Sequence, residues 1–176
     1  MEYSFLRFKK KINSLKSIQM ETTGYGYGIW LQIHTFPRKL QHIPHVTLVC
    51  NIPTQEEATQ IWKELKSHFQ LQQPLHIRVL PKAQIFEGTY SEKDPYTKCW
   101  GYHCELIDIS QTTIQQWINT IMQQNHIPGS TSEQPHITID YETTESLEDL
   151  PSTMELDADL VVADILGSYE KWHILK

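Results

Sequence analysis

Long apolar runs, cysteines and positive charge are all in short supply in this chain of 176 residues. No run of about 18 apolar residues occurs, which excludes an ordinary membrane-spanning helix. The three cysteines, Cys50, Cys99 and Cys104, are too few and too irregularly spaced for a disulfide framework. The first residues also lack the basic-then-apolar build of a signal peptide. We therefore expect a protein of the reducing cytoplasm.

The charge balance narrows the class of partner. The formal net charge is −6 at pH 7, whereas proteins that wrap duplex DNA depend on an excess of positive charge. A single nucleotide or an RNA end needs only a local positive site, so these ligands stay open. With 39% hydrophobic and 20% charged residues, the composition is that of a folded globular domain.

The N-terminal residues 3–18 have the pattern of an amphipathic helix. Phe5, Phe8, Ile12 and Leu15 recur at helical spacing, with lysines on the other side. A helix that packs on the domain and exposes its lysines is the expected structure, and a basic arm for a membrane surface or an anionic partner is the alternative. We assign residues 1–23 to a helical extension and 24–176 to one domain, with a boundary between two lobes near residues 88–96.

Three alternate glycines, Gly24, Gly26 and Gly28, resemble a phosphate-binding loop only superficially. Such loops follow a strand and open a helix, whereas here a strand follows at residues 29–36. A hinge or a close approach of two backbones is therefore the expected role.

The remaining pattern predicts an α+β fold of about eight strands and two or three helices. Thr54 and Glu57 form a capping box at the start of one helix, and a second helix covers Ser110 to about Asn125. Pro81 is expected to separate two strands. The predicted strands are 29–36, 45–52, 75–80, 83–88, 98–108, 156–166 and 169–175, with one more around His136.

Two copies of the pattern Pro-His-apolar-Thr-apolar carry the strongest functional signal. They begin at Pro44 and Pro135, one in each half of the chain. Because alternate residues of a strand share a face, His45 projects with Thr47, and His136 with Thr138. The other face of each copy is apolar. Two His/Thr pairs on strands anchored in the core are therefore expected to converge on one site.

These residue types suit the cleavage of a phosphodiester. One imidazole can remove a proton from the attacking oxygen while the other protonates the leaving oxygen, since the pKa of histidine lies near neutrality. A threonine hydroxyl can donate a hydrogen bond to a phosphate oxygen as its charge grows. This chemistry needs no metal or other cofactor.

The paired motifs, with their α+β context, resemble those of the 2H phosphoesterase superfamily, which is named for two His-x-Ser/Thr motifs. The resemblance extends over residues 25–176, although its specific part is the two pentapeptides. It implies that His45 and His136 are the catalytic acid and base, and that Thr47 and Thr138 bind the phosphate. It also implies two pseudo-symmetric lobes of antiparallel sheet, with helices on the outer faces and a central cleft. The substrates implied are 2′,3′-cyclic phosphates, 2′-5′-linked oligonucleotides and cyclic oligonucleotide signals.

Further residues are candidates for substrate binding. The strand at residues 98–108 mixes aromatic and polar side chains, as a wall that stacks bases does. Packing in the core is the alternative for each aromatic residue. Arg38 and Lys39 precede the first motif and are candidate phosphate contacts. The aromatic candidates are Trp100, Tyr102, Tyr141 and Tyr25.

Other chemistries lack a motif. Cys99, His103 and Cys104 do not have the spacing of a structural zinc site, and no Gly-x-Ser-x-Gly sequence indicates a serine hydrolase. The remaining alternatives are a non-catalytic module that binds an RNA end or a nucleotide, and an interaction protein that acts through its basic N-terminal helix. The sequence leaves the linkage cut, the base and the oligomeric state open.

Overall fold

The computed structural model describes residues 26–69, 74–87, 98–141 and 146–176. Over these ranges the α+β prediction is confirmed: the strands are mostly antiparallel, and they are accompanied by two α-helices. The predicted N-terminal helix, Tyr25 and the boundary near residues 88–96 lie outside the described residues.

The strands form where apolar residues alternate with polar ones. The first motif strand has the predicted bounds, and most of the others differ from prediction by a few residues at their ends. The strands are β1 (Tyr27–Ile33), β2 (His45–Ile52), β3 (Leu75–Glu87), β4 (Lys98–Leu106), β5 (Ser130–Thr131), β6 (His136–Asp140), β7 (Met154–Asp164) and β8 (His173–Ile174).

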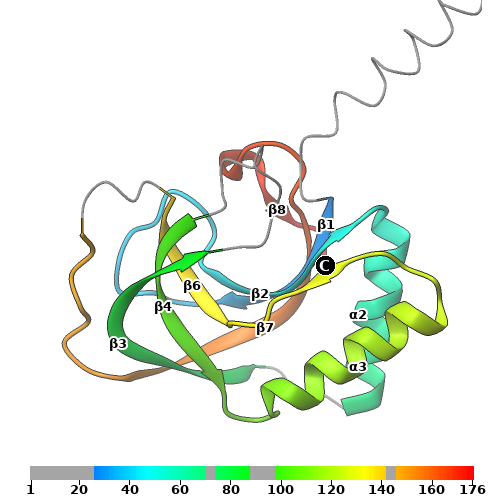
Figure 1. Ribbon diagram of the computed structural model, residues 1–176, viewed down its shortest axis with the longest axis horizontal. Helices are drawn as coiled ribbons and strands as arrows, with labels where there is room; N and C mark the ends of the chain where they lie inside the picture. The colour runs from blue at the N-terminus through cyan, green and yellow to red at the C-terminus, as the bar shows by residue number, and fades with distance from the viewer. Residues whose placement is uncertain (1–25, 70–73, 88–97, 142–145) are drawn as a thin grey trace, which may run out of the picture.

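Six of these strands close into one barrel in the order β1, β2, β6, β4, β3, β7. The closure depends on β7, which pairs with β3 from Met154 to Ala158 and with β1 from Ala158 to Asp164. Figure 1 shows the resulting ring of strands, with β2 and β6 as neighbours in it. The two motifs are therefore brought side by side by the sheet itself.

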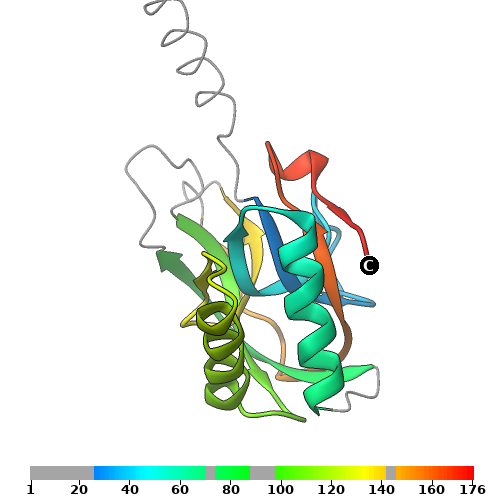
Figure 2. The same ribbon diagram turned by 90° about the vertical axis from the view of Figure 1, so that its right-hand side faces the viewer.

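Two helices, α2 (Gln55–Phe69) and α3 (Gln111–Gln124), lie beside each other on one side of the barrel (Figures 1 and 2). The capping box of α2 is confirmed, because the amide of Glu57 donates to Thr54 Oγ1 and the amide of Thr54 donates to the Glu57 carboxylate. Apolar side chains of both helices join one core with those of the motif strands. This core includes Ile61, Leu65, Ile114, Ile118, Val46, Leu48 and Ile137.

We call the side of β2 and β6 that carries Val46 and Ile137 the core face, and the opposite side the motif face. Val46 and Ile137 are register partners and are fully buried. Since neighbouring residues of a strand point to opposite sides, the two His/Thr pairs lie on the motif face.

The prediction that Pro81 separates two strands is wrong. β3 runs continuously past it, with an irregularity in its pairing with β4 between Val79 and Ala83. Pro81 has no N–H for the ladder, so the strand bulges at this point. The segment after residue 145 forms hydrogen bonds with backbone groups that have no partner in the ladder at this bulge. The amide of Leu150 donates to Pro81 O, and the amide of Ala83 donates to the Asp149 carboxylate.

The C-terminal segment also departs from prediction. In place of one strand at 169–175, a short 3-10 helix, η1 (Tyr169–Lys171), precedes β8. Trp172 is nearly buried against Trp30, and its indole N–H donates to Gly167 O. Gly167, at φ +79°, lies in the bend between β7 and η1. Residues 169–172 therefore bury Trp172 against Trp30 in place of continuing a strand.

Of the three glycines, Gly26 and Gly28 serve the close approach of backbones that was one of their two expected roles, and Gly24 lies outside the described residues. A Cβ atom on Gly28 would lie 2.9 Å from Val49 O.

In the described part of the chain, no helix combines the length and apolar character needed to cross a membrane.

Candidate functional site

The two motifs form a quartet of side chains on adjacent antiparallel strands. The register pair Val46–Ile137, continued by one residue in each direction, places His45 opposite Thr138 and Thr47 opposite His136. Each histidine therefore faces the threonine of the other motif. Diagonal neighbours in such a ladder are about 7–8 Å apart, so the two imidazoles can flank a group the size of a phosphate.

Both imidazoles are oriented by the same hydrogen bond. His45 Nδ1 lies 2.6 Å from Ile43 O, and His136 Nδ1 lies 2.7 Å from Gln134 O. A carbonyl oxygen only accepts, so Nδ1 carries the proton in each ring. In a neutral imidazole this leaves Nε2 as the basic nitrogen. The two motifs thus present the same ring nitrogen for chemistry.

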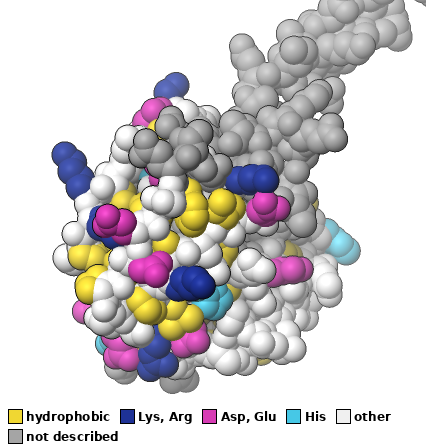
Figure 3. All heavy atoms as spheres, turned by 60° about the vertical axis from the view of Figure 1, so that its left-hand side comes forward, with side chains coloured by type: hydrophobic (Ala, Val, Ile, Leu, Met, Phe, Trp, Pro, Cys, Tyr) yellow, Lys and Arg dark blue, Asp and Glu magenta, His cyan; other side chains and the backbone are white. Residues whose placement is uncertain are grey.

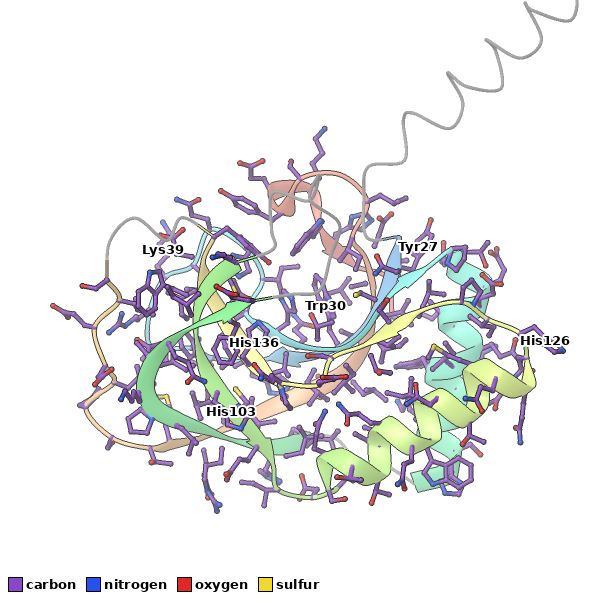
Figure 4. All side chains as sticks on the ribbon, in the orientation of Figure 1. Tyr27, Trp30, Lys39, His103, His126 and His136 are labelled. Carbon is purple, nitrogen blue, oxygen red and sulfur yellow. The ribbon has the colours of Figure 1, made fainter. Side chains whose placement is uncertain are left out.

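Each imidazole also stacks on an aromatic ring that the sequence analysis did not single out. Trp30 of β1 stacks on His45 with centroids 3.6 Å apart and planes 11° apart. Phe86 of β3 stacks on His136 at 4.0 Å and 10°. Figure 4 shows Trp30 and His136 within the ring of strands. A hydrogen bond at the ring edge and a flat neighbour at its face together fix each imidazole.

Cys99 of β4 completes the second half of the site. Its sulfur lies 3.5 Å from His136 Nε2 and 3.4 Å from Thr138 Oγ1. Because Nε2 is the acceptor of the neutral ring, the S–H donates to it and the Thr138 hydroxyl donates to sulfur. Burial raises the pKa of Cys99, which keeps it a thiol. The spacing of the cysteines gave no indication of this contact.

The site disfavours positive charge on its histidines. The pKa of His45 is lowered to about 3, chiefly by burial and to a smaller extent by the nearby His42 and His136, while the hydrogen bond to Ile43 O opposes this shift. Burial likewise lowers the pKa of His136, with a smaller effect from His103, its register partner on β4. Both imidazoles are therefore neutral at pH 7, and an anion bound between them would favour their protonated forms.

His42 belongs to the site although it lies outside both motifs. Its Nε2 donates to Thr138 O at 3.1 Å, and its ring meets that of His45 edge-on with centroids 5.9 Å apart. Burial lowers its pKa as well. The sequence gave no sign of this role, because only the fold brings the loop before β2 against β6.

Of the other candidates, Tyr141 and Lys39 share a pocket with His42. Tyr141 packs near His42, with ring centroids 5.8 Å apart, and both residues line a pocket of about 250 Å³. Lys39 lines the same pocket and is exposed. The pocket lies between the loop before β2, the end of β6 and η1.

The structure places Tyr102 and Arg38 differently. Tyr102 is the register partner of Ile137, so it belongs to the core face, and it is fully buried. Its hydroxyl donates to Glu148 O. Arg38 lies over its ring and donates to the same carbonyl, although it also lines the pocket. Together they fasten the segment after residue 145. Trp100 is half-buried and pairs with Ile85 and Asp140.

One face of the molecule is mixed in charge. Figure 3 shows acidic and basic side chains interspersed on the face that it presents. Among the described residues, no three His, Cys, Asp or Glu side chains are grouped as metal ligands.

Compared with known proteins, the chain matches no protein-family model and no curated protein sequence. The assignment of a function therefore depends on the site itself.

Proposed function

We propose that this protein is a phosphodiesterase that cleaves a small nucleotide phosphodiester through two-histidine acid/base catalysis without a metal. The observation that carries this proposal is the symmetry of the quartet: two imidazoles with the same Nδ1–H bond and the same stacked support, on one face of adjacent strands. If these histidines served packing alone, there would be no reason for the same arrangement to occur twice.

The geometry divides the chemistry between the two motifs. His45 is the more deeply buried, at 5% exposed, and suits the base because burial keeps Nε2 unprotonated. It takes the proton of the attacking hydroxyl as the new P–O bond forms. His136, half-buried, enters as imidazolium and gives its Nε2 proton to the leaving oxygen as the old P–O bond breaks. Solvent then takes the proton from His45 and supplies one to His136, which restores both rings to their starting states.

The threonines suit phosphate binding. Each hydroxyl lies across the ladder from the other motif's histidine, so a phosphorus between the imidazoles is within reach of both. Hydrogen bonds from them would stabilise the charge that builds on the non-bridging oxygens.

The two-lobe arrangement with a central cleft is part of this proposal. β2 with β1, and β6 with β4 and β3, form two groups of strands that meet at the register pair Val46–Ile137, while β7 joins the groups by pairing with both β1 and β3. The proposed cleft lies along this seam, on the motif face where the quartet is found.

The test is incubation with 2′,3′-cyclic mononucleotides, 2′-5′ oligoadenylate and cyclic di- and trinucleotides, with the products separated by chromatography. We expect cleavage of at least one class in the presence of EDTA, and losses of about 100-fold or more in His45→Ala and His136→Ala. His126→Ala is the matched control, since this exposed histidine lies at the end of α3, away from Trp30 and His136 (Figure 4). Full turnover in either motif variant would disprove the proposal. Binding without any product would identify a nucleotide-binding module instead.

A further inference from the structure

The pocket beside His42 is built from two aromatic rings and a few polar groups. Tyr141, which follows β6, and Tyr169 of η1 are stacked with centroids 5.5 Å apart and planes 28° apart, and both line the pocket. Both are half-buried, so each ring is partly covered and partly accessible. Flat rings at the wall of a pocket stack well with nucleobases, whatever the base.

The polar groups of the pocket suit a nucleoside better than a chain of phosphates. Lys39 is exposed and can approach a phosphate. Arg38 also lines the pocket but already donates to Glu148 O, and the carboxylate of Asp140 lines it too. A carboxylate accepts hydrogen bonds from ribose hydroxyls and base amino groups but repels a phosphate. Gln41 Oε1 already accepts from the Tyr169 hydroxyl, which holds that ring in place.

The pocket shares a wall with the catalytic quartet. His42 lines it, donates to the backbone of Thr138 and meets the ring of His45. Tyr169 and Tyr141 both lie near His42, with centroids 6.1 and 5.8 Å from it. A ligand whose phosphate lies between the two motif histidines would therefore have its attached group directed at this wall.

We propose that this pocket is the nucleoside subsite of the enzyme, with the substrate's base stacked on Tyr169 and its phosphate at the quartet. The inference rests on the proposed function and adds the place where the nucleoside of the substrate binds, at the pocket lined by Tyr141, Tyr169 and the loop before β2. His42 then has a positioning role, because it joins the subsite to the catalytic strand.

The experiment is calorimetric binding of AMP and of ribose 5-phosphate, which lacks the base, to the full chain. Tyr169→Ala is expected to weaken AMP binding by about 5- to 150-fold and to leave ribose 5-phosphate unchanged. Tyr169→Phe keeps the ring and loses the bond to Gln41, so it should bind AMP nearly as the wild type does. Lys171→Ala, on the same short helix and exposed, is the matched control.

Three results would overturn the subsite: no binding of AMP by the wild type, unchanged affinity in Tyr169→Ala, or an equal loss in Tyr169→Phe. Hydrolysis of bis(p-nitrophenyl) phosphate, which has no nucleoside, tests the quartet separately. A selective loss of AMP affinity in a protein that cleaves nothing would refute the phosphodiesterase and leave the subsite standing. Unchanged AMP affinity in Tyr169→Ala, in a protein that cleaves the chromogenic diester, would refute the subsite and leave the phosphodiesterase standing.

Discussion

Acidification should destabilise this protein through His45. In the folded chain, burial lowers the pKa of this imidazole to about 3 from 6.5. The unfolded chain therefore binds a proton that the folded chain refuses. The free energy of unfolding falls as the pH drops below about 6.5, and it continues to fall until the pH approaches the folded pKa.

The size of the effect follows from these two pKa values. Near pH 7.5 the imidazole is neutral in both states and contributes almost nothing. Near pH 5 it is still neutral in the folded state and almost fully protonated in the unfolded state. The difference costs about 2 kcal/mol of stability between these two pH values, since each pKa unit is worth about 1.4 kcal/mol.

His45→Asn isolates this contribution. The asparagine Nδ2 takes the place of the ring Nδ1, so the bond to Ile43 O can persist while the titrating group is lost. Urea unfolding of both proteins, measured at several values from about pH 7.5 to pH 5, gives the two stability curves. The wild type should lose about 2 kcal/mol more than the variant over this range.

His126→Asn is the control for the loss of a histidine. This residue is exposed and has φ +54°, a conformation that asparagine tolerates. Its curve should run parallel to that of the wild type. His42 and His136 also have pKa values lowered by burial, so some acid sensitivity should remain in His45→Asn. Parallel curves for the wild type and His45→Asn would refute the reasoning.

Three other outcomes are expected. The profile of kcat/KM against pH should be bell-shaped, because His45 must be neutral and His136 must be protonated. Its maximum should lie below pH 6.5, since the pKa values of both histidines are lowered. An alkaline maximum would contradict this. Cys99→Ala should lower kcat/KM and shift the limb of that profile that is set by His136. Cys99→Ser keeps a hydrogen-bond donor and should preserve the shape of the wild-type profile. Identical profiles for Cys99→Ala and the wild type would rule out a role for the thiol. Gly101→Ala should cost about 1–3 kcal/mol in urea unfolding, because its Cβ would meet Ile137 O and crowd Phe86, and wild-type stability would contradict this.

The sequence was sufficient where a local pattern determines the structure. The bounds of β2 and the capping box of α2 follow from residues adjacent in the chain, and the structure confirms both. The two predictions of secondary structure that fail, at Pro81 and at residues 169–175, concern segments whose partners are distant. Asp149 and Leu150 form hydrogen bonds with the backbone at the bulge of β3, and Trp172 packs against Trp30. No local pattern contains these contacts.

The same distinction applies to the site. The motifs identify His45, Thr47, His136 and Thr138, and the alternation of a strand places each pair on one face. That the two pairs are adjacent depends on the register of β2 with β6, which is a property of the closed barrel. The supporting residues Trp30, Phe86, Cys99 and His42 come from other strands and one loop, and none of them has a motif of its own.

The supports of the two histidines are alike in geometry and different in chemistry, and this difference bears on how the roles are divided. His45 lies against an indole that is 1% exposed, whereas His136 lies against a phenyl ring and accepts from a thiol. The first environment excludes water on one face of the ring and favours a base that stays neutral. The second places Nε2 beside a thiol, a weak hydrogen-bond partner that a leaving oxygen can displace once Nε2 is protonated. An acid and a base can thus arise from one repeated motif, because the residues packed around each copy differ.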